Sequence, residues 1–359
     1  RADYGIYKNL LDLFKSNKNI KIIIIAFGMH LQKQHGDTLN EIKKDNFNII
    51  TVQGMPYNDS KYDISNGYGE IVKSFSNLWN DSVFDVVFAL GDRFEMNAAV
   101  QSGIPFEVNF AHIHGGEISL GSIDNIYRDQ ISIASKIHFT STIESRKRLL
   151  NMLINNKNIY NVGSLSIDRL NFLELPNWFS VCHKFDIPNK PFALITFHPE
   201  TINNNNNTLF VEILIKTLSE LCKSIHLVIT QANADSYGNL YRQMSVDLKN
   251  KFPKRISVIN SFGKLNYFSA MKNSNFLLGN TSSGIIEAAS FGKHVFNVGD
   301  RQSGRVRSEN IIDVKFDKEE ILEAIAPFLK KQTYKGLNRY KLSNTALKIY
   351  DNTLKYLNQ

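Results

Sequence analysis

Short β-rich runs alternate with helical patterns along the whole chain, and this alternation constrains the fold more than any other feature. The runs in the first half are IKIIIIAF, DVVFALG, FEVNFAHI, KIHFTS and IYNVG, and those in the second half are FALITF, HLVIT, ISVIN, FLLGN and HVFNVG. Strands that alternate with helices assemble into parallel sheets covered by helices. The sequence therefore predicts an α/β fold with two parallel sheets, one in each half of the chain.

The length of the chain points to two domains, because 359 residues exceed what one hydrophobic core usually holds. The stretch FLELPNWFSVCHKFDIPNKP contains three prolines and no clear period, and we expect the domain linker between residues 170 and 190. We predict an N-terminal Rossmann-like domain over residues 1–170 and a C-terminal one over 190–338. Apolar residues at helical spacing predict a C-terminal helix over 339–359.

Composition narrows the classes of protein. Hydrophobic residues make up 43% and charged residues 21%, as in a globular domain, and no apolar run approaches the roughly 20 residues of a membrane span. The net charge of +8 comes from scattered Lys and Arg, which argues against a nucleic-acid surface and fits a small polyanionic substrate. Cys182 and Cys222 lie far apart without ligand-type partners, so neither a disulfide framework nor a zinc site is expected. With no signal-peptide pattern at its start, the chain is expected to be cytoplasmic.

The segment NFLLGNTSSGIIEAASFG resembles an anion-binding turn. A buried strand ends in Gly279, and a helix is predicted to begin at Ser282 and Ser283. The start of a helix offers free N–H groups and partial positive charge, the hydroxyls add donors, and Gly284 would allow close backbone approach, which together suit a diphosphate. Glu287, about one turn further, is placed to accept ribose hydroxyls. Ordinary N-capping by Ser or Thr is the alternative interpretation.

Two other strand ends in the second half carry basic side chains. The segment VGDRQSGRVRSENII brings Arg301, Arg305 and Arg307 into a loop that follows a strand, and LITFHPET places His198 directly after another. Ligands of open α/β sheets bind at the carboxyl ends of the strands. A ligand site is therefore indicated there, with a solvated basic loop and a structural histidine as the alternatives.

Acids and imidazoles gather at strand ends in the first half. GDRFE places Asp92 after a buried strand, and HIHGGEISLGSID places His112, His114, Glu117 and Asp124 after the next. Proton transfer to and from carbon requires an acid and a base in fixed positions, and these residue types have pKa values that proteins tune for that purpose. The cluster predicts proton-transfer chemistry, and a helix cap or a surface pair is the alternative interpretation of any single acid.

Metal binding is the competing interpretation of the same loop. Residues two apart in a strand share a face, so in this interpretation His112 and His114 converge on a metal together with Glu117. Catalytic zinc usually takes a well-defined third ligand, and hard cations prefer carboxylate-rich sets. Neither requirement is met nearby in the sequence, and we expect no metal.

The motifs taken together resemble a known family. RADYG, GDRFE, HIHGGE, SIDNIYRDQISIASKIHFTST, VGSLSIDRL, TFHPET and GNTSSGIIEAASFGKHVFNVGDRQSGR occur in this order over nearly the whole chain. They resemble the hydrolysing UDP-N-acetylglucosamine 2-epimerases of sialic and legionaminic acid synthesis. The resemblance implies a GT-B-like fold, two Rossmann-like domains facing an interdomain cleft, assembled as a homodimer or homotetramer. Relatives usually begin with a strand that ends in a TGTRADY-like loop, so the resemblance also implies that this strand is missing ahead of Arg1.

The resemblance implies a reaction in two stages. UDP is eliminated with loss of the C2 proton, and the resulting 2-acetamidoglucal is hydrated to the manno-configured sugar. The implied substrate is UDP-N-acetylglucosamine, giving N-acetylmannosamine and UDP, with UDP-2,4-diacetamido-2,4,6-trideoxyglucose (UDP-N,N'-diacetylbacillosamine) as the alternative, and no cofactor is implied. A GT-B glycosyltransferase and a non-catalytic UDP-sugar sensor are the alternatives from other classes of protein.

The resemblance also implies roles for individual residues. Many relatives carry a glutamate where this chain has His114, so the C2 base is His114, Glu117 or Asp124. By matching position, the implied diphosphate residues are Ser282, Ser283 and Gly284, the ribose residue is Glu287, the residues near the phosphates are Arg1 and His198, the sugar-side acids are Asp92, Glu117 and Asp124, and the further ligand contacts are Asn233, Arg301 and His30.

Overall fold

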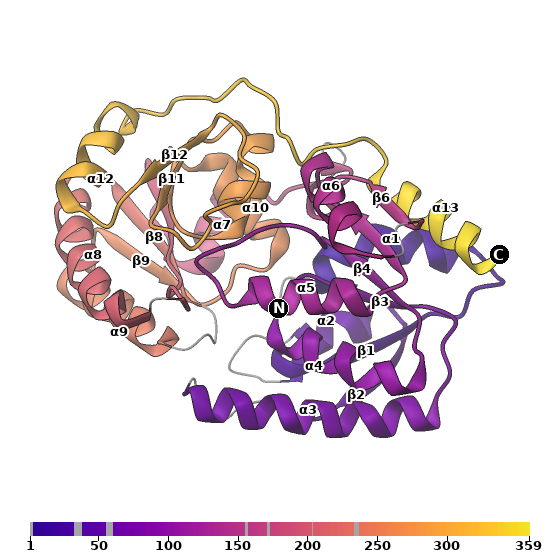
Figure 1. Ribbon diagram of the computed structural model, residues 1–359. Coiled ribbons are helices and arrows are strands. Elements are labelled where there is room, and N and C mark those ends of the chain that lie inside the picture. Colours follow the sequence, from indigo (N-terminus) through magenta and orange to yellow (C-terminus); the bar gives the residue numbers. More distant parts are fainter. Residues whose placement is uncertain are drawn as a thin grey trace. The chain divides into compact units, whose positions relative to one another are not determined.

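The protein consists of two compact units in a computed structural model, which describes residues 3–31, 38–54, 60–154, 157–170, 173–202, 204–232 and 237–359 (Figure 1). Unit 1 comprises Arg1–Ile118, Ile123–Asn171 and Tyr340–Gln359, and unit 2 comprises Ser119–Ser122 and Phe172–Arg339. The C-terminal segment thus belongs to the first unit. Four residues from the middle of the HIHGGEISLGSID loop belong to the second.

Unit 2 is built on a parallel six-stranded sheet in the order β12-β11-β10-β7-β8-β9. Its strands read as continuous apolar runs, such as the fully buried FALIT of β7, because helices cover both faces of a parallel sheet. If β7 is numbered as the first strand, the order read from β9 to β12 is 3-2-1-4-5-6, which is the doubly wound order. The direction of winding changes between β7 and β10. The strands are β7 (Phe192–Thr196), β8 (His226–Thr230), β9 (Ile256–Ile259), β10 (Leu277–Gly279), β11 (Val295–Val298) and β12 (Ile311–Val314).

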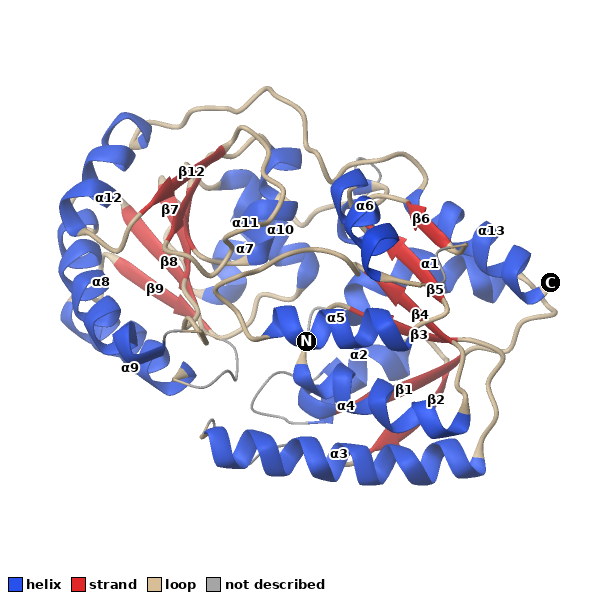
Figure 2. Ribbon diagram, in the orientation of Figure 1, coloured by secondary structure: helices blue, strands red, loops and turns tan. Residues whose placement is uncertain are grey.

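Helices cover both faces of this sheet, and a separate apolar core lies between the helices and the sheet on each face. Figure 2 shows α8, α9 and α12 on one face and α7, α10 and α11 on the other. Leu214 and Leu218 of α8 belong to the first core, and Val181 of α7 and Met271 of α10 belong to the second. The helices are α7 (Trp178–Phe185), α8 (Asn207–Leu221), α9 (Gly238–Lys251), α10 (Lys264–Asn273), α11 (Ser282–Ile286) and α12 (Lys318–Ile325).

The strands of unit 1 form two parallel sheets among the described residues, where the sequence predicted one. One sheet pairs β1 with β2, and the other has the order β3-β4-β5-β6. β2 and β12 were not predicted, because NIITV and IIDV are only partly buried and show little of the apolar run of a central strand. The strands are β1 (Ile23–Phe27), β2 (Asn48–Val52), β3 (Val87–Leu90), β4 (Phe110–Ile113), β5 (Ile137–Thr140) and β6 (Ile159–Asn161).

The helices of unit 1 also pack in two groups. Figure 1 shows α13, in yellow, beside α1, and the rings of Phe14 and Tyr350 lie 5.1 Å apart between them. The other core joins Phe75 and Trp79 of α3 with Val100 of α4 and Ile131 of α5. The helices are α1 (Asp3–Ser16), α2 (Thr38–Lys44), α3 (Lys61–Asp81), α4 (Phe94–Gly103), α5 (Asp124–Ala134), α6 (Ile143–Met152) and α13 (Thr345–Leu357). The 3-10 helices among the described residues of both units are η1 (Gly28–Leu31), η3 (Ile104–Phe106), η4 (Leu165–Ile167), η6 (Asn204–Asn206), η7 (Ala288–Phe291) and η8 (Ala326–Phe328).

The segment expected to be a plain linker contains a helix. α7 begins after Asn177, whose side chain accepts a hydrogen bond from the N–H of Phe179, and it buries Val181 and Cys182. The eight-residue helix is too short for its period to stand out between prolines. In the part of the chain that is described, no helix has the length and apolarity to span a membrane.

Candidate active site

The winding of unit 2 reverses at β7 and β10, and predicted site residues follow both strands. In doubly wound sheets a ligand binds outside the carboxyl ends of the strands at this point. Asn280, fully buried after β10, donates its backbone N–H to the carbonyl of Thr196 at 3.1 Å. Its side-chain oxygen accepts the N–H of His198 at 2.8 Å, and its side-chain nitrogen donates to the carbonyl of His198 at 2.9 Å. Asn280 thereby fixes the backbone of His198 beside the predicted diphosphate turn.

The predicted diphosphate turn is a capped but very short helix. α11 has five residues, and Thr281 is its N-cap, with Oγ1 accepting the N–H of Ser283 at 3.4 Å. The short length limits the dipole contribution that the sequence suggested, so the donors themselves, N–H groups and hydroxyls, must supply most of any anion affinity. Glu287 ends α11 and is buried, as expected for a residue held at a fixed position.

Gly284 packs closely against the neighbouring strand. A Cβ at this position would lie 3.0 Å from Cγ1 of Val295 in β11. The absence of a side chain therefore lets the short helix pack closely against the sheet.

The loop after β11 is tied to the two other strand ends. Arg301 is buried, and its Nε donates to the carbonyl of Pro199 at 3.2 Å. Gln302 donates from Nε2 to the carbonyl of Asn280 at 2.9 Å. Three loops of unit 2, those that carry His198, the diphosphate turn and Arg301, are thus joined by hydrogen bonds.

Tyr267 of α10 is a residue of this region that sequence reasoning missed. Burial, reinforced by the negative charge of Glu287, raises the pKa of Tyr267 to about 12. The phenol therefore keeps its proton and is a hydrogen-bond donor at neutral pH. No motif marked it, because a tyrosine in an amphipathic helix usually packs in the core.

In unit 1 the carboxyl ends of β4, β5 and β6 bring together a histidine, a carboxylate and two serines. Nδ1 of His114 lies 2.9 Å from Oε1 of Glu117, and the hydroxyl of Ser141 donates to the same oxygen at 2.6 Å. Oγ of Ser164 lies 3.3 Å from Nε2 of His114. His114 has a φ of 70°, a left-handed conformation that costs free energy in a residue with a side chain, so the surrounding contacts must hold it. The two serines were not among the predicted site residues.

Asp92, at the end of β3, pairs with a buried arginine that the sequence analysis also missed. Arg128 of α5 has a side chain that is only 1% exposed, and its guanidinium contacts the carboxylate of Asp92. Nη1 of Arg128 also donates to the backbone carbonyl of Glu117 at 3.0 Å. Arg128 thus connects Asp92 to the loop that carries His114. The sequence pattern that could have identified Arg128 is its position on the apolar face of α5, one turn before Ile131.

His112 is held in a way that does not suit a metal ligand. Nδ1 lies 2.9 Å from the hydroxyl of Ser132, and Nε2 lies 2.8 Å from the carbonyl of Gly91. Burial lowers the pKa of His112 to about 4, so the ring is neutral near pH 7. Both ring nitrogens are engaged in structural hydrogen bonds between β4, α5 and the end of β3.

The remaining predicted residues are dispersed. Asp124 is the first residue of α5, and His30 lies in η1, where burial lowers the pKa of its imidazole to about 4. Arg1 and Asn233 lie outside the described residues. The structure thus groups His114 with Glu117, and Asp92 with Arg128, in unit 1, and His198 with the diphosphate turn and Arg301 in unit 2.

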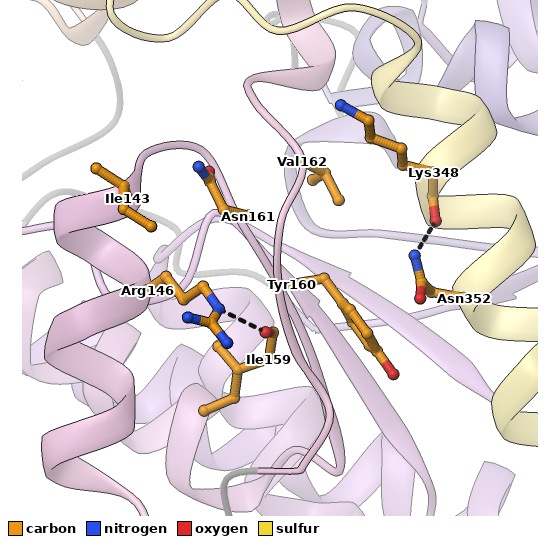
Figure 3. Close-up of a pocket in the computed structure, with 8 residues that line it drawn as sticks. All are labelled: Ile143, Arg146, Ile159, Tyr160, Asn161, Val162, Lys348 and Asn352. Atoms are coloured by element: carbon orange, nitrogen blue, oxygen red, sulfur yellow. Dashed lines mark hydrogen bonds between the residues drawn. The ribbon is translucent and has the colours of Figure 1, made fainter.

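A surface hollow of about 380 Å³ lies elsewhere in unit 1, between α6, β6 and α13 (Figure 3). Its wall includes Arg146, whose Nε donates to the carbonyl of Ile159 at 2.9 Å and so satisfies an acceptor on the edge strand. None of the predicted site residues lines it; the lining residues are Ile143, Arg146, Ile159, Tyr160, Asn161, Val162, Lys348 and Asn352.

The chain belongs to the UDP-N-acetylglucosamine 2-epimerase family, whose model matches residues 13–353. It is 34% identical over 317 residues to the GDP/UDP-N,N'-diacetylbacillosamine 2-epimerase (hydrolyzing) of Campylobacter jejuni, covering 87% of this chain and 82% of the relative. It is 32% identical over 353 residues to the UDP-N,N'-diacetylbacillosamine 2-epimerase (hydrolyzing) of Legionella pneumophila, covering 98% and 92%. The predicted family is confirmed, and the chain is a UDP-sugar 2-epimerase by membership.

A solved structure supports the fold. The UDP-GlcNAc 2-epimerase of Neisseria meningitidis, solved with UDP-GlcNAc bound, superimposes with a TM-score of 0.70 at 18% identity, covering 94% of this chain and all of that one. Together with the parallel sheets of the two units, this similarity confirms the predicted class of two Rossmann-like domains of GT-B type.

Proposed function

We propose that this protein is a hydrolysing 2-epimerase that releases UDP from a UDP-2-acetamido sugar and forms the free manno-configured sugar. The observation that carries the proposal is the buried contact between His114 and Glu117, with Ser141 on the same carboxylate oxygen. An oriented imidazole at a strand end is suited to remove a proton from carbon. Simple transfer of the sugar to an acceptor has no need of such a base.

The nucleotide is assigned to unit 2. Ser282 and Ser283 are proposed to donate to the diphosphate, and Glu287 to accept from the ribose. His198 and Arg301 supply imidazole and positive charge at neighbouring strand ends, and their backbone and side-chain hydrogen bonds hold them in place. Arg1 and Asn233 are added to this set by the resemblance alone.

The sugar is assigned to the residues of unit 1. In the first stage a base takes the proton from C2, the C2–H electron pair forms the C1–C2 double bond, and the C1–O bond breaks as UDP leaves. In the second stage water adds its hydroxyl to C1 and a proton returns to C2 from the opposite face. His114, Glu117, Asp92 and Asp124 are the proposed catalytic side chains, and no cofactor enters either stage.

Two sugars are the candidate substrates. The sequence resemblance gave UDP-N-acetylglucosamine first, whereas both relatives described above are named for UDP-N,N'-diacetylbacillosamine. The names therefore favour the diacetylated 6-deoxy sugar. A homodimer or homotetramer is proposed by resemblance to the family.

The decisive experiment is incubation of the protein with each UDP-sugar in deuterated water, without an acceptor. We expect UDP, together with a free manno-configured sugar that carries deuterium at C2, and a higher kcat/KM with UDP-N,N'-diacetylbacillosamine. Absence of UDP release from both sugars would contradict the proposal. Release of UDP only when an acceptor is added would favour a glycosyltransferase.

A further inference from the structure

The two ring nitrogens of His114 contact partners of different character. Nδ1 faces the carboxylate of Glu117 at 2.9 Å, and Nε2 faces the hydroxyl of Ser164 at 3.3 Å. All of these side chains are buried at the carboxyl ends of β4 and β6. The protein contacts, and not bulk water, therefore determine which nitrogen of the His114 ring carries the hydrogen.

Counting donors and acceptors places that hydrogen on Nδ1. An ionised carboxylate can only accept, so Oε1 of Glu117 takes hydrogens from Ser141 and from Nδ1 of His114. In the form of the ring with one hydrogen, Nε2 is then a bare acceptor to which the hydroxyl of Ser164 can donate. The Ser164 oxygen in turn lies 3.0 Å from the hydroxyl of Ser166 and accepts the N–H of Ser166 at 3.4 Å.

The neighbouring histidine shows the opposite arrangement. Nε2 of His112 faces the carbonyl of Gly91, which can only accept, so Nε2 carries the hydrogen and Nδ1 accepts from Ser132. His112 therefore has no basic nitrogen outside a strong structural contact. In His114 the basic nitrogen, Nε2, contacts the hydroxyl of Ser164 at the long distance of 3.3 Å. A hydrogen bond of this length is weak, so a substrate atom can replace the hydroxyl.

We propose that Ser164 is a positioning residue that holds Nε2 of His114 as the atom that accepts the C2 proton, with Glu117 as the orienting carboxylate. This inference rests on the proposed function. Ser164 first turns its hydrogen toward Ser166, which frees the lone pair of Nε2. When the C2–H bond breaks, its proton passes to Nε2 and its electron pair forms the C1–C2 double bond as UDP departs. The imidazolium then donates from both nitrogens, from Nδ1 to Glu117 and from Nε2 to the Ser164 oxygen.

The test compares two serines that each contact a histidine ring. Ser164→Ala removes the hydroxyl at His114, and Ser132→Ala removes the equivalent buried hydroxyl at His112. For each variant, kcat, KM and the incorporation of deuterium at C2 are measured with the better UDP-sugar, and UDP affinity is measured by calorimetry. Ser164→Cys, which keeps the volume and a weak donor, is the conservative variant.

We expect Ser164→Ala to lower kcat and deuterium incorporation together by about tenfold or more, less than the roughly 10²–10⁴-fold contributed by a proton-transferring group itself, because Ser164 acts through His114. KM and UDP affinity should stay within twofold of wild type. Ser164→Cys should recover part of the rate, and Ser132→Ala should keep kcat within twofold. Wild-type kcat in Ser164→Ala, or equal losses in the Ser164 and Ser132 variants, would overturn the inference.

A measurement that does not depend on activity separates this inference from the proposed function. The ¹⁵N shifts of labelled histidine report which ring nitrogen carries the hydrogen, and we expect His114 to be protonated at Nδ1 and His112 at Nε2. Hydrogen on Nε2 of His114 in the wild type would overturn the inference even if UDP is released. Failure to release UDP from any sugar would overturn the proposed function, whichever nitrogen is protonated.

Discussion

Asn280 holds the backbone of His198 from both sides, accepting its N–H at 2.8 Å and donating to its carbonyl at 2.9 Å, although the two residues lie 82 positions apart. They follow β10 and β7, which are neighbours in the sheet. The pairing extends the ladder of hydrogen bonds beyond the last strand residues and sets the position of the His198 backbone relative to the predicted diphosphate turn.

Asn280→Ala should lower UDP affinity about tenfold or more and reduce the free energy of unfolding by roughly 2–3 kcal/mol, because two buried backbone groups lose their partners. Calorimetric titration with UDP and thermal unfolding measure the two effects. Asn310→Ala is the matched control, since Asn310 is equally buried and donates to the carbonyl of Lys293 at 2.8 Å at the amino ends of the strands. The control should lose stability but keep its UDP affinity, and equal loss of affinity in both variants would contradict the assignment.

Asp92→Asn should remove nearly all turnover and also reduce the free energy of unfolding by about 3 kcal/mol, since it removes the charge that balances the buried guanidinium of Arg128. Binding of UDP should change little. Asp129→Asn provides the comparison, because Asp129 pairs with Arg148 at 2.6 Å where both side chains are about a quarter exposed, 24% and 27%. That substitution should cost no more than about 1 kcal/mol and leave kcat unchanged. Near-normal turnover in Asp92→Asn would show a structural role.

Gly121→Ala should reduce kcat/KM at least tenfold while the fold is retained. Gly121 lies within unit 2, and an added Cβ would meet the carbonyl oxygen of Asp300 at 2.3 Å and Cα of Arg301 at 2.6 Å. The loop that presents Arg301 would have to move. Gly69→Ala, on the exposed face of α3 with nothing within 4 Å, should leave activity unchanged and raise stability by up to about 1 kcal/mol. Steady-state kinetics and thermal unfolding of both variants check the prediction, which a fully active Gly121→Ala would refute.

Stability should fall as the pH is lowered from about 6.5 to about 4. The ordinary pKa of histidine is 6.5, and burial lowers the pKa of His112 to about 4 in the folded protein. Between these values the unfolded chain takes up a proton that the folded chain does not, so acid favours unfolding, by up to about 1.4 kcal/mol per pH unit for this group.

The measurement is the free energy of unfolding by urea at several pH values between 4 and 7. His112→Gln should reduce the slope, because it removes the buried imidazole whose pKa is lowered in the folded protein. An unchanged slope in His112→Gln would assign the acid sensitivity to other groups.

The sequence by itself determined the α/β class, ten of the strand positions and the strand ends at which His114, Glu117, His198 and Arg301 lie. These features follow from local pattern, since continuous apolar runs make buried parallel strands and polar residues directly after them must lie at one edge of a sheet. The ordered list of motifs was also sufficient for the family.

Only the tertiary structure determined which buried side chains contact one another. Arg128, Ser141 and Ser164 reach the loop that carries His114 and Glu117 from other strands and helices, and no local pattern specifies which buried polar groups will meet. The same holds for the close packing of Gly284 against Val295 of the adjacent strand, and for α13, which completes the first unit from the far end of the chain. Contacts between residues distant in sequence depend on how the elements pack together, and that packing is the sum of many weak, non-local interactions that no single segment encodes.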